Sequence, residues 1–236
     1  MQPIKLTTLP YSHCRGSEAQ RRQLCEKMLK KTFELLNAEL EKSSEIDVIQ
    51  IRKCIKKVLP RKNIILSVSE NNQNENYLNY IIDNDDKIKG YYISLEPNSN
   101  GKFDNRYLNT ILHEIWHLFE LMTNPKIGVR FNNIDREDLK IYYSFYTKYI
   151  YAENFIGSKK IRSLLKEFMD RFREKDKINI LQHMRYDLKG EKDAYEMANK
   201  YAWDGCYYCG FDRKLRILNR ELKKQIDVRR KNVCKE

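Results

Sequence analysis

One stretch of the chain, residues 91–122, constrains the fold more than any other. It reads as a short strand at 91–95, a polar turn with Pro97 and Gly101, and a helix that begins after Asp104. Large apolar side chains recur every three or four residues along this helix, as they do when one helical face is buried. The stretch therefore predicts a unit of strand, turn and helix in which Asp104 caps the helix.

The same helix carries the pattern His-Glu-x-x-His, formed by His113, Glu114 and His117. Side chains four residues apart on a helix point the same way, so both imidazoles can reach one metal ion. Glu114 lies on the adjacent strip, where a carboxylate can hold a metal-bound water without ligating the metal. Zinc lowers the pKa of such a water to roughly 7, and a carboxylate can then remove its proton. Asn109 and Thr110 keep this face polar, which indicates a cleft suited to hydrolysis.

A catalytic zinc site needs a third protein ligand, and several acidic residues are weaker candidates for it. Glu120 lies too close to His117 on the same helix to turn back on the metal. Glu137 stands near a helix start, where an acidic residue offsets the helix dipole. Glu196 has lysines four residues to either side, which is typical of a solvent-exposed ion pair. His183 is the least favoured candidate.

Two glutamates remain as the main candidates, Glu153 and Glu191. Glu153 has tyrosine and isoleucine neighbours that make its helical face apolar. Glu191 heads a row of alanines at helical spacing, and alanines let one helix approach another closely. The row consists of Ala194, Ala198 and Ala202. This face is therefore predicted to look inward, where a carboxylate needs a compensating charge such as a metal ion.

Residues 91–122 resemble the active-site region of the zincin superfamily of metallopeptidases, in which a His-Glu-x-x-His helix follows an edge strand. The resemblance implies that His113 and His117 are zinc ligands and that Glu114 is the general base. It also implies that the strand at 91–95 is the edge strand that pairs with the backbone of the substrate.

Residues 191–198 resemble the third-ligand helix of ImmA/IrrE-type and related gluzincin peptidases. The matching residues are Glu191, Ala194, Met197 and Ala198. The resemblance implies that Glu191 is the third zinc ligand and that roughly 130–185 is an insertion. Tyr195 stands where those families usually have Asn or Asp, and Asp193 can supply the hydrogen bond that orients the site instead.

The rest of the chain is predicted to be mainly helical, because Gly and Pro number only 8 and 5 among 236 residues. Apolar periodicity predicts one more strand at 63–68 and helices at 18–41, 44–60 (with Ser44 as N-cap), 138–155, 161–172, 190–203 and 213–228. The predicted fold is α+β and zincin-like, a small twisted sheet with an active-site helix and a largely helical body. We expect a single domain over 1–236, with the helices at 18–60 and a basic C-terminal helix at 212–234 as appendages.

The formal charge of +12 and the pI near 9.3 suggest an acidic partner such as nucleic acid, bound through the C-terminal helix. Interleaved acidic residues favour the alternative of a solvated surface. Cys206 and Cys209 resemble half of a zinc knuckle, and two thiols without a metal are the alternative. The N-terminus lacks a signal-peptide pattern and no apolar run is long enough for a membrane span, so we expect a cytoplasmic protein without a membrane partner.

These patterns predict an intracellular zinc-dependent metallopeptidase that hydrolyses a peptide bond in a protein substrate. The substrate is expected to be a regulatory protein, such as a transcription repressor, or a DNA-associated protein. His183, Tyr186 and Tyr195 are candidates for stabilising the oxyanion. The competing hypothesis is a nucleic-acid-binding protein on a zincin scaffold with little or no catalysis, against which Glu114 argues because a structural site needs no general base.

Overall fold

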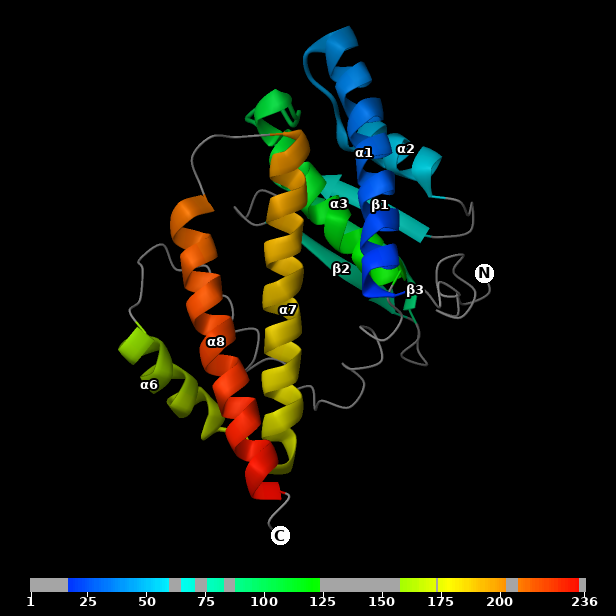
Figure 1. Cartoon of the computed structure of the whole chain (residues 1–236). Helices are drawn as coiled ribbons and strands as arrows, with labels where there is room; N and C mark the ends of the chain where they lie inside the picture. The colour runs from blue at the N-terminus through cyan, green and yellow to red at the C-terminus, as the bar shows by residue number, and fades with distance from the viewer. Residues whose placement is uncertain are drawn as a thin grey trace. The chain divides into compact units, whose positions relative to one another are not determined.

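The computed structural model describes residues 17–59, 65–70, 76–82, 88–123, 158–172, 174–202 and 208–233. They belong to two compact units, of which the first spans 1–127 and 193–204 and the second spans 128–192 and 205–236. Helix α7 (Glu174–Tyr201) runs unbroken through the boundary, so its last turns belong to the first unit (Figure 1). The single domain over 1–236 stays a prediction.

Three strands form the sheet of the first unit, namely β1 (Ile65–Glu70), β2 (Tyr77–Ile82) and β3 (Ile88–Leu95). Their order is β1-β3-β2, with β3 parallel to β1 and antiparallel to β2. The prediction that 91–95 is an edge strand is therefore wrong, because β3 is hydrogen-bonded on both sides. The strand β2 was not predicted, and its pairing with β3 makes β3 the central strand.

Gly90 allows the close approach of β1 and β3. It pairs with Ile65, and a Cβ at position 90 would lie 2.3 Å from the Ile65 carbonyl oxygen. No side chain fits at that separation, which is the usual reason for a glycine inside a strand. The parallel register of the sheet thus depends on this one residue having no side chain.

Two helices precede the sheet, α1 (Glu18–Ser43) and α2 (Val48–Val58). Ser44 ends α1 in the left-handed conformation, with φ of 55°, and does not cap α2 as predicted. Asp47 is the N-cap instead, because its carboxylate accepts the Gln50 N–H at 2.8 Å. The Gln50 side chain in turn accepts the Asp47 N–H at 2.9 Å, which completes a capping box.

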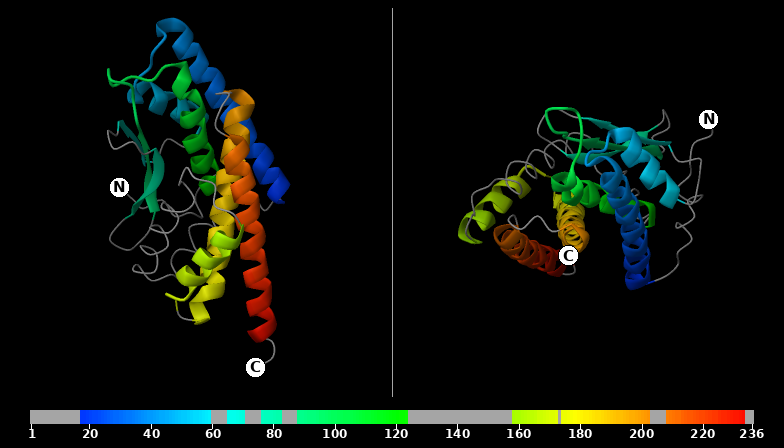
Figure 2. Two further views of the ribbon diagram at one scale, coloured as in Figure 1. Left: turned by 90° about the vertical axis from the view of Figure 1, so that its left-hand side faces the viewer. Right: turned by 90° about the horizontal axis from the view of Figure 1, so that it is seen from above.

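The core of the first unit lies between the sheet and its helices. Helix α2 packs against β1, helix α3 (Leu108–Thr123) packs against β2 and β3, and α1 packs against both helices (Figure 2). The largest fully buried side chains include Trp116, Phe119, Tyr91, Leu29, Leu36 and Ile51. Burial raises the pKa of the Tyr91 hydroxyl. The N-terminal helices, expected as appendages, thus contribute to the same core as the predicted site helix.

The second unit has its own apolar core, built from α6 (Ser158–Met169), the earlier turns of α7 and α8 (Tyr208–Val233). Helix α7 begins at Glu174 rather than near 190, so Gly190 lies inside it. Burial along α7 outweighs the cost of a glycine in a helix, about 1 kcal/mol. Cys209 lies in the first turn of α8 rather than in a turn before it, and Cys206 is outside the described residues.

The described residues support the coarse α+β class, because helices predominate around one small mixed sheet. None of the described helices combines the length and the apolar character that crossing a membrane requires. The helix predicted at 138–155 falls outside the described residues.

Candidate metal centre

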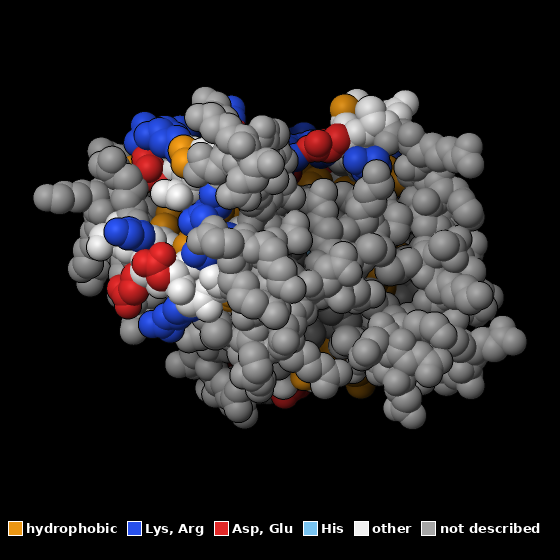
Figure 3. Space-filling view, turned by 90° about the horizontal axis from the view of Figure 1, so that it is seen from below, with side chains coloured by type: hydrophobic (Ala, Val, Ile, Leu, Met, Phe, Trp, Pro, Cys, Tyr) orange, Lys and Arg blue, Asp and Glu red, His pale blue; other side chains and the backbone are white. Residues whose placement is uncertain are grey.

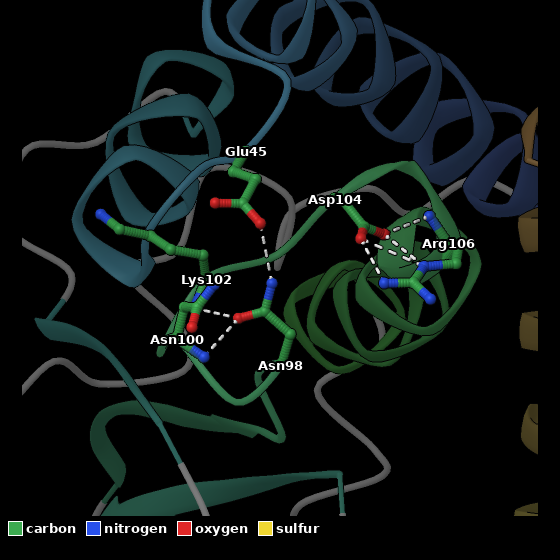
Figure 4. Close-up of polar contacts among 6 residues, drawn as sticks. All are labelled: Glu45, Asn98, Asn100, Lys102, Asp104 and Arg106. Atoms are coloured by element: carbon green, nitrogen blue, oxygen red, sulfur yellow. Dashed lines mark hydrogen bonds and ion pairs between the residues drawn. The ribbon is translucent and has the colours of Figure 1, made fainter.

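The loop between β3 and α3 is held by the side chain of Asn98 (Figure 4). Its Oδ1 accepts the backbone N–H groups of Asn100 at 3.0 Å and Lys102 at 2.9 Å. Its Nδ2 donates to the Glu45 carboxylate at 2.9 Å, which joins the loop to the connection between α1 and α2. Gly101 adopts φ of 69° at the tip of this turn, a conformation that glycine adopts without strain. These bonds fix where the site helix begins.

Asp104 caps the short 3₁₀ turn η2 (Asn105–Tyr107) that leads directly into α3, so the predicted capping role of Asp104 is confirmed. Its carboxylate accepts the Arg106 N–H at 2.9 Å and also binds the Arg106 guanidinium, with Nη2 2.7 Å from Oδ2 (Figure 4). The hydrogen bonds from Arg106 lower the pKa of Asp104. A carboxylate at this position also suits the positive end of the helix dipole.

Helix α3 places the two histidines of the motif side by side. Nε2 of His117 lies 3.0 Å from Nε2 of His113, and the ring centroids are 4.7 Å apart. A tetrahedral zinc ion with Zn–N bonds of about 2.0–2.1 Å separates two ligand nitrogens by about 3.4 Å. The observed separation is slightly shorter than this, so a small movement of the side chains would let both nitrogens bind one ion. His113 and Glu114 are buried, each 6% exposed, so the motif is largely withdrawn from water.

Helix α7 brings a carboxylate to this pair. The ligand atoms of His113, His117 and Glu191 all lie within 4.8 Å of one another, the one such group of His, Cys, Asp or Glu among the described residues. Oε2 of Glu191 and Nδ1 of His113 are buried. Two imidazoles and one carboxylate form a donor set that divalent transition metals such as zinc accept. The group can hold a metal ion.

The alanine row of α7 accounts for the close approach of this helix. Ala194 and Ala198 are fully buried in the core of the first unit, and Ala202 packs partly buried against it. The prediction that this face looks inward is confirmed. The Tyr201 ring packs on Phe33 of α1, with centroids 5.7 Å apart, and anchors the end of the helix.

Acidic residues of α7 next to Glu191 bind α1. Asp193, predicted to orient the metal site, instead accepts a hydrogen bond from Arg22 at 2.5 Å. Glu196 binds the same guanidinium at 3.0 Å and is about half exposed, so it takes part in an ion pair near the surface that joins the two helices. Lys200 pairs with Glu26 of α1. These charges attach α7 to α1 on the side away from the alanine row.

The ring of Tyr195 on α7 packs against the ring of His113. The two ring centroids are 4.2 Å apart with an interplanar angle of 51°. One turn along each helix, Nδ2 of Asn109 donates to Oδ1 of Asn199 and to the carbonyl oxygen of Ala202, both at 2.7 Å. Asn199 was not among the predicted site residues, although its spacing of eight residues from Glu191 on one helix was a usable signal.

The other predicted candidates stand apart from this group or outside the described part of the chain. Glu120 is described on α3 and is not among the three clustered residues. Glu137 and Glu153 lie outside the described residues, as do the side chains of His183 and Tyr186.

No protein family, curated protein or solved structure matched this chain in comparisons. Its function must therefore be argued from the arrangement of its own residues. The strongest such arrangement is the group of His113, His117 and Glu191.

Proposed function

We propose that this chain is a zinc-dependent metallopeptidase with a zincin-like site, a hydrolase of peptide bonds in a protein substrate. The observation that carries the proposal is the approach of Glu191 to His113 and His117 within 4.8 Å. The helix that carries both histidines also carries Glu114. A structural zinc site is usually closed by four protein ligands, whereas three leave one position open for chemistry.

Each residue of the group has a distinct task in this proposal. Neutral His113 and His117 hold the ion through Nε2, and Glu191 supplies the third donor and a negative charge. Bound zinc would lower the pKa of a coordinated water and polarise the scissile carbonyl. The Glu114 carboxylate accepts the proton of the attacking water and passes it to the leaving amine. Tyr195, which packs on His113, is a candidate donor to the developing oxyanion.

An extended substrate needs a strand edge, and β3 has none because both its sides are paired. Among the described strands, β2 stands at the edge of the sheet next to β3 and packs against α3. We therefore transfer the predicted pairing with the substrate backbone from β3 to β2. A peptide added there would form main-chain hydrogen bonds, with side-chain pockets for specificity. An intracellular location and a regulatory or DNA-associated substrate remain predictions.

The test compares Glu114→Gln with the wild type for zinc content and for cleavage of a synthetic peptide mixture followed by mass spectrometry. Loss of the proton acceptor should reduce cleavage by at least about 10²-fold. Zinc content should stay at one equivalent. The matched control is Glu120→Gln on the same helix, which should keep both properties. Loss of zinc from Glu114→Gln, or a zinc-loaded wild type that cleaves nothing, would contradict the proposal.

A second candidate function is nucleic-acid binding by α8, because this helix buries its apolar side and exposes basic side chains. The exposed basic residues are Arg216, Arg220, Lys223 and Lys224. The view from below shows Lys and Arg interleaved with Asp and Glu among the described residues (Figure 3). Glu221 binds Lys224 at 3.3 Å, which reduces the positive field further. This interleaving makes nucleic-acid binding the weaker candidate.

Titration of the protein with duplex and single-stranded DNA and RNA at low salt tests nucleic-acid binding by α8. Each neutralised phosphate should add about −0.9 to the slope of log affinity against log salt for duplex DNA. Charge reversal at Lys223 and Lys224 should flatten that slope and leave peptide cleavage unchanged. No binding at micromolar protein would end this candidate without affecting the first.

A further inference from the structure

Helices α3 and α7 meet along three successive polar positions at the same spacing of four residues. The facing pairs, in order, are Asn109 with Asn199, His113 with Tyr195, and His117 with Glu191. In each pair the two residue numbers have the same sum, which is the signature of antiparallel helices in one fixed register. The third pair belongs to the proposed metal group, and the first lies two turns away from it.

Asn109 satisfies both protons of its amide through this contact. It is 3% exposed, and its Nδ2 donates to Oδ1 of Asn199 and to the Ala202 carbonyl oxygen, each at 2.7 Å. A carbonyl oxygen only accepts, so the Asn109 atom facing Ala202 must be the nitrogen. The Ala202 carbonyl follows the last turn of α7, where carbonyl groups lack partners within the helix. One side chain of α3 thus binds both a side chain and the C-terminal end of α7.

This arrangement permits only one register. A buried amide without partners is costly, and sliding α7 by one helical turn, about 5.4 Å, would remove both acceptors of Asn109. A shift of one residue would rotate α7 by about 100° and turn Glu191 away from the histidines. The alanines and the Tyr195 ring provide close packing, but apolar contacts tolerate small slips better than paired polar groups do.

We propose that Asn109 is a positioning residue: its bonds to Asn199 and Ala202 set the register of α7 on α3 and thereby hold Glu191 beside His113 and His117. The proposal rests on the metal-binding part of the proposed function and not on catalysis. It adds Asn109 and Asn199 to the site as residues that neither bind the metal nor transfer a proton. Its measurable consequence is metal affinity, because a displaced Glu191 leaves only two imidazole donors.

The experiment measures the affinity of the metal-free protein for Zn²⁺ by competition with a chromophoric chelator, and records the visible spectrum of the Co²⁺-loaded form. Asn109→Ala should weaken Zn²⁺ affinity by about 10- to 100-fold, as for other residues that orient metal ligands. Its Co²⁺ spectrum should change because the carboxylate no longer binds. The matched control is Ile51→Val in α2, which trims the same core and should leave both measurements unchanged.

A second pair of variants keeps the test decisive if Asn109→Ala does not fold. Asn199→Asp retains an acceptor oxygen for Asn109 and should keep near-wild-type affinity, whereas Asn199→Ala removes it and should lose affinity. Wild-type affinity in folded Asn109→Ala, or equal affinities for the two Asn199 variants, would overturn the inference alone. A wild type that binds no Zn²⁺ would overturn the metal site itself, and the inference with it.

Discussion

The ion pairs between α1 and α7 allow a prediction about stability that contains its own control. One guanidinium, that of Arg22, binds two carboxylates that differ in burial. Arg22 binds Asp193 at 2.5 Å and Glu196 at 3.0 Å. The Asp193 side chain is 9% exposed, whereas that of Glu196 is 45% exposed and that of Arg22 is 36% exposed. Burial alone would lower the pKa of the Arg22 guanidinium, but Asp193 and then Glu196 raise it above its usual value. The two carboxylates should therefore contribute unequally to stability.

The perturbation is Asp193→Ala, compared with Glu196→Ala. Breaking a fully buried pair costs about 3–5 kcal/mol, and a hydrogen bond to a charged group is worth about 1.5–3 kcal/mol. Arg22 keeps Glu196 and some water as partners, so we expect Asp193→Ala to cost about 2 kcal/mol. Glu196→Ala removes an exposed pair and should cost about 0.5 kcal/mol. For a chain of this size, the corresponding losses in Tm are about 4–8 °C and about 1–2 °C.

The assay is thermal and urea unfolding of both variants and of the wild type, at low salt and at 0.5 M NaCl. Alanine has a higher helix propensity than either residue, and it exceeds Asp by more than it exceeds Glu, so this difference works against the larger loss expected for Asp193→Ala. Salt should remove most of the small Glu196 effect and little of the Asp193 effect, because buried pairs are less screened. Equal losses, or a larger loss for Glu196→Ala, would refute the argument from burial.

Three further predictions concern the sheet, the helix start and the metal. Gly90→Ala should cost at least about 1–3 kcal/mol in urea unfolding, because the new Cβ meets the Ile65 carbonyl. Asp104→Ala should cost about 1 kcal/mol at pH 7. Since the fold lowers the pKa of Asp104, its contribution is present above the unfolded value of about 3.9 and is lost as the pH falls through the lower folded pKa. The difference between wild type and variant should therefore shrink in acid, and a constant difference would contradict this. Chelation should lower Tm, because free Zn²⁺ at 100 times its Kd stabilises by about 2.7 kcal/mol. An unchanged Tm with chelator would count against the metal site.

Much of the local structure was predictable because local signals determine it. The helix carrying His113 and His117 follows from its apolar period, and the capping role of Asp104 from residue type and position. The inward face of Ala194 and Ala198 follows from spacing alone. Local signals also misled where two of them competed. Ser44 and Asp47 are both good N-caps, and only Gln50 three residues after Asp47 decides between them.

The partners of these residues were not predictable in the same way. The sequence indicates a strand at 91–95, but its central place depends on β2. The run of aromatic and aliphatic residues in β2 was a usable strand signal, but the order of the strands is set by their pairing in space. Asp193 could have bonded to a histidine or to a basic residue, and the packing of α1 supplies Arg22. Gly190 suggested a helix start, yet packing carries α7 through it.

The sequence by itself determined that two imidazoles and a carboxylate share one helix, because positions four residues apart on a helix are neighbours whatever surrounds them. It also determined that α7 has a face of small alanine side chains, which allows another element to pack closely against it. Only the tertiary structure decided which carboxylate joins His113 and His117, since that contact joins residues far apart in the chain. The register of α7 on α3 determines that this carboxylate is Glu191. That register depends on the buried hydrogen bonds of Asn109 to Asn199 and Ala202, and no local sequence pattern specifies these bonds.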